Sequence, residues 1–199
     1  MVNNIVRKGL MALTQKQSSI FTAAFFIVAT TILGQVLGIF KYRLLVAIFG
    51  ASSDLGVFLA SFRIPDFLFQ ILIAGALSTS FIPLFSEFLS QNRKEEANRF
   101  SSAIISYGVL IYIFISFVII IFARPLSGLV APGFSPQEID LMASLTIIIQ
   151  LSQVFFVVGT VFSGILQSHQ HFLVPGIASA LYNLGIILGI VFLSPSLGL

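Results

Sequence analysis

Residues 34–87 read GQVLGIFKYRLLVAIFGASSDLGVFLASFRIPDFLFQILIAGALSTSFIPLFSE. Long runs of Ile, Leu, Val, Phe and Ala in this stretch are interrupted by charged and amide side chains: Lys41, Arg43, Arg63, Asp66 and Gln70. An ionisable group at bilayer depth costs roughly 2.5 to 3.5 kcal/mol, so it usually faces a hydrated cavity or a partner. These side chains therefore indicate where a membrane-spanning protein would carry its function.

The composition of the whole chain predicts an all-α integral membrane protein. Of its 199 residues, 57% are hydrophobic and 9% are charged, and the mean hydropathy is +1.07. That much apolar surface cannot be hidden in one small soluble core. The chain has no cysteine, and its two histidines, His169 and His171, are weak evidence for a metal site. We expect no metal, no cofactor and no nucleic-acid partner, since Lys and Arg do not cluster on a soluble face.

The hydropathy pattern predicts about five transmembrane helices, each close to or longer than the ~20 residues that a span requires. Their expected ranges are about Ile20–Phe49, Leu55–Phe88, Ser101–Phe122, Ile139–Ser168 and Pro175–Leu193. Residues 20–199 would thus form one transmembrane bundle. Residues 1–19 are a basic, weakly amphipathic lead that either lies along the membrane surface or has no fixed structure.

Two prolines and two polar stretches mark the breaks between these spans. Pro65 predicts a kink in the second span, and Pro125 predicts the end of the third helix by disfavouring a helical Arg124. The charged run Glu87–Arg99 and the Pro- and Gly-rich run Ala123–Gln137 are expected to be loops.

One face of the first span combines small residues with a charge. Steps of three and four residues place Thr31, Gly34, Gly38 and Lys41 on the same side of a helix. The pair Gly34 and Gly38 forms a GxxxG motif that lets a neighbouring helix approach closely. We expect Lys41 to face a cavity inside the bundle, whereas Arg43 on the opposite side reaches the lipid headgroups.

Polar residues also follow helical spacing in later spans. In the second span the stripe consists of Arg63, Asp66, Gln70, Ala74 and Ser78. Either Arg63 and Asp66 form an ion pair that neutralises itself, or Arg63 binds an anion. In the fourth span the polar side consists of Gln153, Thr160, Ser163 and Gln167, which we expect to join helices through hydrogen bonds. The fifth span contains a second GxxxG pair, Gly185 and Gly189.

The distribution of basic residues predicts the orientation. With a cytoplasmic N-terminus, most loop Lys and Arg residues lie inside, as the positive-inside rule requires. Those residues are Arg7, Lys8, Lys16, Arg93, Lys94 and Arg99. No nucleophile is paired with a base anywhere in the chain, so an enzyme is not expected.

Several motifs carry a resemblance to a known family. Residues 36–88, LVAPGF at 129–134 and GILQSHQHFLVPGIASALYNLGII at 164–187 occur in the order found in the MviN/MurJ lipid II flippases. These flippases belong to the multidrug/oligosaccharidyl-lipid/polysaccharide exporter superfamily, and the resemblance runs from about Ile32 to Val191. It implies a two-lobed helical transporter in the bacterial cytoplasmic membrane. Its substrate would be lipid II, a peptidoglycan precursor on undecaprenyl pyrophosphate, moved from the inner to the outer leaflet.

The resemblance also implies which residues bind substrate. Lys41 stands where the family usually has a cavity arginine, and Arg63 in FRIPD matches the basic residue of F-[RK]-[IL]-P-N. Asp66 replaces the Asn of that motif, while Gln35 and Gln70 stand where arginines are expected. Lys and Arg would hold the pyrophosphate through charge-assisted hydrogen bonds. The expected substrate-binding residues are Lys41, Arg63, Asp66, Gln35 and Gln70.

The family's chains are more than twice as long as this one, which matches only an incomplete N-terminal lobe. Alternating access requires two units moving about a shared site. We therefore expect a fragment of a flippase or one piece of a split transporter, with the remaining helices and the membrane lipids as partners. Two alternatives stay open: an exporter of another polysaccharide carrier or a drug, and a non-transporting scaffold that joins partner helices through its GxxxG faces.

Overall fold

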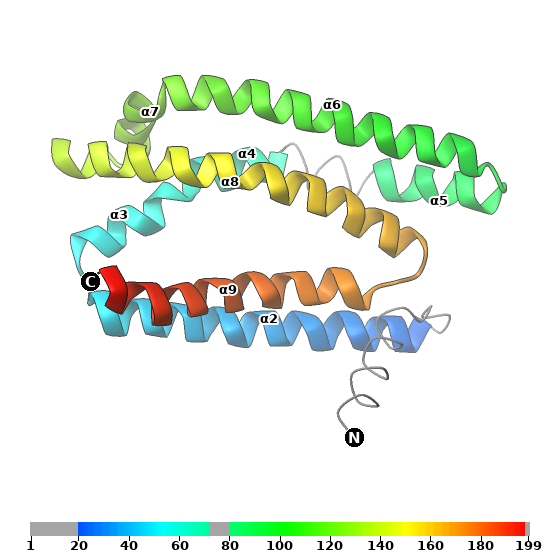
Figure 1. Ribbon diagram of the computed structural model, residues 1–199, viewed down its shortest axis with the longest axis horizontal. Helices are drawn as coiled ribbons and strands as arrows, with labels where there is room; N and C mark the ends of the chain where they lie inside the picture. Colours follow the sequence, from blue (N-terminus) through cyan, green and yellow to red (C-terminus); the bar gives the residue numbers. More distant parts are fainter. Residues whose placement is uncertain (1–19, 72–79, 198–199) are drawn as a thin grey trace. The chain divides into compact units, whose positions relative to one another are not determined.

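The computed structural model describes residues 20–71 and 80–197. Within those ranges the regular elements are all helices (Figure 1), which confirms the predicted all-α class. The surface helix considered for residues 1–19 lies outside the described ranges. The chain divides into two compact units. The first unit contains Met1–Phe49 and Leu166–Leu199, and the second unit contains Gly50–Ile165.

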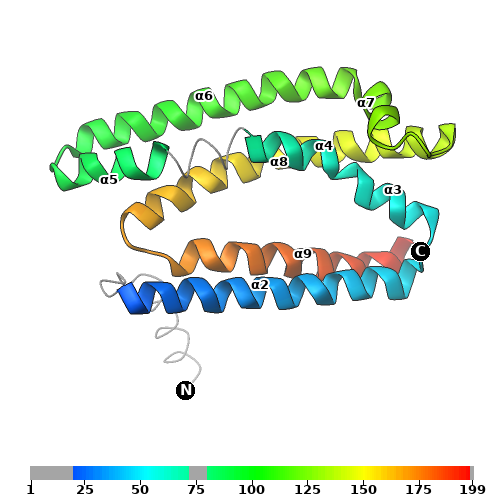
Figure 2. The same ribbon diagram turned by 180° about the vertical axis from the view of Figure 1, so that it is seen from behind.

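The first unit is built on two helices that lie side by side, α2 (Ile20–Phe49) and α9 (Leu173–Leu197). Both views show them running in the same direction (Figures 1 and 2). Their spacing is close because small residues meet along the contact, as described below. The pair therefore forms a parallel two-helix element.

The second unit contains α3 (Ser53–Ser61), α4 (Arg63–Phe69), α5 (Ile82–Ser90), α6 (Lys94–Ile121), α7 (Ala123–Val130) and most of α8 (Pro136–Ser168). Its core is a cluster of buried side chains: Leu68, Phe81, Phe85, Ala97, Tyr112, Val157 and Val161. The rings of Phe81 and Phe85 stack at 5.4 Å between centroids, and Phe81 stacks on Phe100 at 5.5 Å. Aromatic stacking thus joins α5 to α6.

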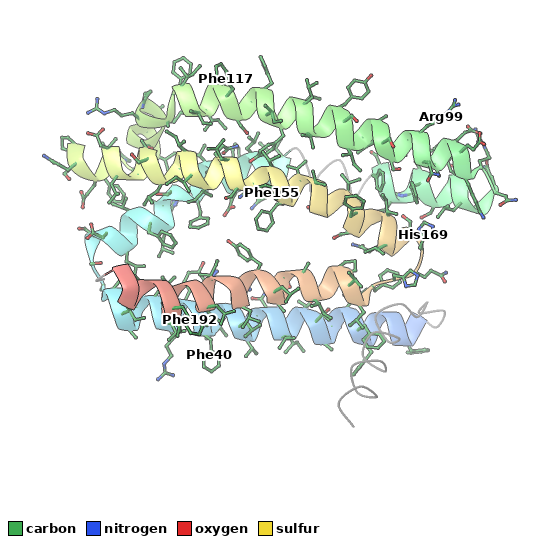
Figure 3. The ribbon with its side chains drawn as sticks, in the orientation of Figure 1. Phe40, Arg99, Phe117, Phe155, His169 and Phe192 are labelled. Carbon is green, nitrogen blue, oxygen red and sulfur yellow. The ribbon has the colours of Figure 1, made fainter. Side chains whose placement is uncertain are left out.

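In the part of the chain that the structure describes, four helices are long and apolar enough to cross a membrane. They are Ala24–Phe49, Lys94–Ile121, Pro136–Ser168 and Leu173–Phe192, and they coincide with the first, third, fourth and fifth predicted spans. Large apolar side chains project from them, with Phe117 61% exposed, Phe155 80% and Phe192 70% (Figure 3). Apolar exposure on that scale indicates surfaces that face lipid or other helices rather than water.

The second predicted span, Leu55–Phe88, is interrupted. Its described parts form α3, α4 and α5, and residues 72–79 lie outside the description. Proline has no N–H and displaces the carbonyl four residues earlier. Pro65 accordingly leaves the carbonyl of Ser61 free at the α3–α4 junction, which confirms the predicted kink. The Thr146 hydroxyl of α8 donates a hydrogen bond to that carbonyl at 3.2 Å. The carbonyl that the proline leaves without a helical partner is therefore hydrogen-bonded within the protein.

The charged run Glu87–Arg99 is not the loop that we predicted. Only residues 91–93 separate α5 from α6. Asn92 adopts a left-handed conformation with φ of 59°, and the Arg93 N–H donates to the Phe88 carbonyl at 2.9 Å, which ends α5 as a Schellman turn. The charged residues that follow fall in the first turns of α6, where acidic side chains meet the positive end of the helix dipole.

The run Ala123–Gln137 is not a loop throughout either. It contains the short helix α7 and the first residues of α8, so only residues 131–135 connect helices. Pro125 is tolerated in the first turn of α7, because the N–H that it lacks would have no partner within the helix. The predicted third span ends at Phe122, within one residue of the end of α6 at Ile121. Arg124 is helical in α7, so the prediction that Pro125 keeps Arg124 out of a helix is wrong.

Candidate functional site

The small-residue face of α2 packs directly against α9. A Cβ atom added to Gly34 would lie 2.6 Å from the Ser179 hydroxyl oxygen, and one added to Gly38 would lie 3.8 Å from the Asn183 amide nitrogen. The prediction that this GxxxG face accommodates a helix is confirmed, and the partner is α9. The second GxxxG pair behaves differently. Around Gly185 and Gly189 no atom of the described structure lies within 4 Å of such a Cβ.

Asn183 fixes the register of the two helices. Its amide nitrogen donates to the Gly34 carbonyl across the interface at 3.1 Å and to the Ser179 carbonyl of its own helix at 3.2 Å. A hydrogen bond from a side chain to a facing backbone can form only where the helices approach closely. The glycine at 34 and the amide at 183 therefore work together to position α9 on α2.

Lys41 lies on the same face of α2, one turn beyond Gly38, and is half-buried. Its ammonium nitrogen is 4.6 Å from the ring centroid of Tyr42 and 5.5 Å from that of Tyr182 on α9. Both distances are within the ~6 Å at which a cation is attracted to an aromatic face. Gln35 and Arg43, on other sides of α2, are exposed.

The first unit has an unusual charge distribution. All seven acidic residues of the chain lie within Gly50–Ile165, so no Asp or Glu belongs to the first unit. Its charged side chains are all basic: Arg7, Lys8, Lys16, Lys41 and Arg43. The sequence therefore offers no carboxylate from this unit to neutralise Lys41. Its aromatic neighbours attract the ammonium but leave its full charge in place.

Arg63, Asp66 and Gln70 belong to the second unit. Arg63 is the first residue of α4 and is exposed, and Gln70 follows the last residue of the same helix. The Asp66 carboxylate accepts a hydrogen bond from the Gln153 amide of α8 at 2.9 Å. The two ion pairs between described residues are Arg93 with Glu96 and Arg124 with Asp140. The rest of the predicted stripe, Ala74 and Ser78, lies outside the described residues.

The charged turn between α5 and α6 holds a solvated ion pair rather than a binding site. Arg93 donates hydrogen bonds to both carboxylate oxygens of Glu96. That side-chain hydrogen bond is the main reason why the pKa of Arg93 lies above its ordinary value. Both side chains are exposed, and exposed pairs contribute little to stability.

The second unit contains a buried polar cluster that was not predicted from the sequence. The amide nitrogen of Gln150 donates to the hydroxyl oxygens of Tyr112 and Ser116 on α6, at 2.8 Å in each case. Gln150 and Tyr112 are completely buried. Within the described residues the Gln150 carbonyl oxygen has no hydrogen-bond partner. The spacing of Thr146, Gln150 and Gln153 would have revealed this face of α8, since steps of four and three stay on one side of a helix.

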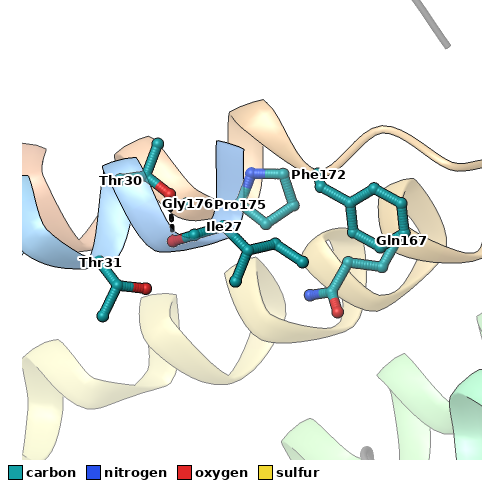
Figure 4. Close-up of a pocket in the computed structure, with 7 residues that line it drawn as sticks. All are labelled: Ile27, Thr30, Thr31, Gln167, Phe172, Pro175 and Gly176. Atoms are coloured by element: carbon teal, nitrogen blue, oxygen red, sulfur yellow. Dashed lines mark hydrogen bonds between the residues drawn. The ribbon is translucent and has the colours of Figure 1, made fainter. Parts of the chain in front are cut away.

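The expectation that polar residues of the fourth span join helices is met by Gln153, which reaches Asp66 on α4. It is not met by Thr160, whose hydroxyl donates to the Phe156 carbonyl of its own helix at 2.7 Å. Gln167 instead lines a cavity of about 200 Å³ in the first unit (Figure 4).

The cavity does not contain the predicted binding residues. Its lining consists of Ile27, Thr30, Thr31, Gln167, Phe172, Pro175 and Gly176. The Thr30 hydroxyl is used locally, since it donates to the carbonyls of Phe26 at 2.6 Å and Ile27 at 3.1 Å. Pockets for drug-sized ligands have volumes of about 300 to 1,000 Å³, so this one is too small for them.

The structure thus divides the candidate residues between the two units. Gln35 and Lys41 lie on α2 in the first unit, whereas Arg63, Asp66 and Gln70 lie on or next to α4 in the second. That both groups face one hydrated chamber stays a prediction.

Comparison with known proteins gives a consistent result. The family model described as lipid II flippase MurJ matches residues 45–199. That range includes Arg63, Asp66 and Gln70, and it begins after Gln35 and Lys41. No solved structure matches the chain.

Three relatives illustrate the similarity. A probable lipid II flippase MurJ from Buchnera aphidicola subsp. Schizaphis graminum is 31% identical over 166 residues, which cover 82% of this chain and 32% of the relative. The probable lipid II flippase MurJ of Aquifex aeolicus is 31% identical over 185 residues, which cover 90% of this chain and 36% of the relative. The lipid II flippase MurJ of Burkholderia cenocepacia is 29% identical over 181 residues, which cover 90% of this chain and 35% of the relative. This chain spans about a third of the length of the curated relatives that it matches.

Proposed function

Since this chain belongs to the lipid II flippase MurJ family, we propose that it forms part of a transporter for lipid-linked peptidoglycan precursors. The transporter would move the precursor, which is carried on the lipid undecaprenyl pyrophosphate, from the inner to the outer leaflet of the bacterial cytoplasmic membrane. The chain spans about a third of its relatives, so we propose that further helices of a complete transporter supply the rest of the cavity.

The observation that carries the site assignment is the environment of Lys41. Its ammonium lies 4.6 Å and 5.5 Å from the centroids of two neutral rings, in a unit whose sequence contains no Asp or Glu. A cation in such a place favours a phosphate, which accepts strong charge-assisted hydrogen bonds from Lys. We propose that Arg63, exposed at the start of α4, contributes a second positive charge and that Gln35, Asp66 and Gln70 line the same site.

We also propose that the N-terminus is cytoplasmic. This orientation places the basic lead and the charged turn around Arg93 on the inner side, where Lys and Arg accumulate in membrane proteins. The precursor's pyrophosphate would then meet the basic residues from the leaflet in which it is made.

An exporter of cationic drugs is the second transporter candidate, and the charges argue against it. Such a substrate would require buried carboxylates in the cavity. Asp66 is the only acidic residue among the described residues of the second predicted span that precede α5. Its carboxylate accepts a hydrogen bond from the Gln153 amide. The substrate that the arrangement supports best is anionic.

The test is charge removal in the complete protein. We expect the double variant Lys41→Gln, Arg63→Gln to abolish flipping, because it removes both proposed phosphate donors and keeps polar side chains of similar length. Flipping is measured by growth of cells depleted of their own flippase, and by the fraction of lipid II that an external reagent can reach.

The matched control is Arg43→Gln, which removes an exposed cation two positions from Lys41 on the same helix and should leave flipping unchanged. Protein amounts in the membrane must be equal for all variants. Full activity of the double variant at normal expression would refute the assignment of Lys41 and Arg63 as substrate-binding residues.

A further inference from the structure

We propose that Tyr182 of α9 is a positioning residue for Lys41, holding its ammonium in place for a pyrophosphate group. This inference rests on the proposed role of Lys41 in substrate binding. Tyr182 would not touch the substrate, but would determine where the positive charge lies when the anion arrives.

The position of Tyr182 along α2 is set by a hydrogen bond across the α2–α9 interface. Asn183, the next residue along α9, donates to the Gly34 carbonyl at 3.1 Å, and Gly38 faces the same amide at 3.8 Å from its would-be Cβ. Neither helix can slide along the other without breaking this hydrogen bond. This register places Tyr182 beside Lys41, with the ring centroid 5.5 Å from the ammonium nitrogen.

The two rings near Lys41 differ in what they can do. Tyr42 is the adjacent residue on α2, so its ring moves together with Lys41. Tyr182 comes from a helix 141 positions further along the chain and provides a reference point outside α2. Of these two rings, Tyr182 is the one that can hold the ammonium relative to a second helix.

An aromatic partner suits a phosphate-binding lysine better than a carboxylate would. Lysine is a point charge on a flexible stem and lacks the pre-organised fork of arginine. The ring faces attract the ammonium and restrict the stem, yet they are neutral and do not compete with the anion for charge. The sequence of the same unit contains no Asp or Glu side chain.

The experiment measures binding of farnesyl pyrophosphate, a short lipid pyrophosphate, to the complete protein in detergent. We expect Tyr182→Leu to raise Kd by about three- to tenfold, as the loss of one partly desolvated cation–π contact predicts. Tyr182→Phe keeps the ring and should bind within about twofold of the wild type. Tyr107→Leu removes an exposed tyrosine of α6 and serves as the matched control, which should not change Kd. If Tyr182→Leu fails to fold, Tyr182→Met is used in its place.

A double variant separates positioning from an independent or purely structural effect. If Tyr182 acts through Lys41, then Lys41→Gln with Tyr182→Leu binds as weakly as Lys41→Gln alone. If Tyr182→Leu weakens binding by the same factor with and without Lys41, or if Tyr182→Phe binds as poorly as Tyr182→Leu, the positioning role is wrong.

The same series distinguishes this inference from the proposed function. Unchanged affinity in Lys41→Gln would overturn the substrate-binding role of Lys41 and the positioning role with it. Weakened affinity in Lys41→Gln together with wild-type affinity in Tyr182→Leu would overturn only the positioning role.

Discussion

At the scale of single residues, Gln150 shows how a polar side chain can be buried between helices. Its amide nitrogen joins α8 to two hydroxyl groups of α6, while its carbonyl oxygen has no partner among the described residues. The two hydrogen bonds stabilise the contact, and the unsatisfied oxygen offsets part of that gain.

We expect Gln150→Leu to lower the free energy of unfolding by about 1 kcal/mol, since hydrogen bonds between membrane helices contribute on average roughly 0.6 kcal/mol each. Leucine fills most of the space, so cavity formation adds little. The measurement is denaturant unfolding in mixed micelles. Gln137→Leu is the matched control on the same helix, where the side chain is exposed, and it should change stability by less than about 0.5 kcal/mol. Equal stability of Gln150→Leu and the wild type would contradict the network's role.

Residues whose role depends on their own helix were predictable from the sequence. Gly34, Gly38 and Lys41 share a face because of helical spacing alone, and the structure places that face in contact with a neighbour. The contacts of Gln150 and Tyr182 were not predicted, because their partners lie on other helices. Gln150 contacts Tyr112, 38 positions away, and Tyr182 contacts Lys41, 141 positions away. No local pattern encodes which helix will fill a groove.

At the scale of helices, Gly176 is the described glycine with the least space for a side chain. A Cβ atom there would lie 2.7 Å from the Thr30 Cβ and 3.1 Å from its methyl carbon. Thr30 cannot easily turn away, because it is β-branched and its hydroxyl is bonded to the Phe26 carbonyl. Any side chain at position 176 must therefore separate the two helices.

We expect Gly176→Ala to destabilise the helix pair by about 1 to 3 kcal/mol, the usual cost of overpacking a close contact. Gly185→Ala makes the same change on the same helix, with no atom of the described structure within 4 Å, and it should be nearly neutral. Thr30→Ala removes the obstructing atoms, so the double variant with Gly176→Ala should recover most of the lost stability. Thermal unfolding in detergent reports all three, and a tolerated Gly176→Ala would show that the interface is looser than the structure indicates.

The boundaries of helices were less predictable than their existence. The four apolar helices were expected because a span needs a long hydrophobic run, and the break near Pro65 followed from the chemistry of proline. Helix α7 and the first turns of α6 were mistaken for loops. A solvated helix turn has the same charged residues as a loop, and a proline such as Pro125 is compatible with the start of a helix as well as with its end.

At the scale of the whole molecule, the parallel packing of α2 and α9 limits the number of membrane crossings. Thr30 meets Gly176, and Gly38 meets Asn183, so both helices run in the same direction. Two parallel spans must be connected by a chain that crosses the membrane an odd number of times. Helices α6 and α8 supply two crossings. We expect the third crossing in the segment 50–93, of which residues 72–79 lie outside the description, in agreement with the five-span prediction. Helices α3, α4 and α5 are each too short to cross alone.

Five crossings predict which connections between spans a reagent can reach from outside the cell. The chain has no cysteine, so a thiol reagent labels only the cysteine that is introduced into it. Single cysteines are introduced at Ala51, Gln91, Gln137 and His169, one in or beside each connection between spans. We expect a membrane-impermeant maleimide to label positions 51 and 137 in intact cells, and positions 91 and 169 only after permeabilisation. Exchange of the two groups would keep five crossings and reverse the proposed orientation. Labelling of 51 and 91 from the same side would instead mean that the α3–α5 segment does not cross, and two parallel helices could then not both span the membrane.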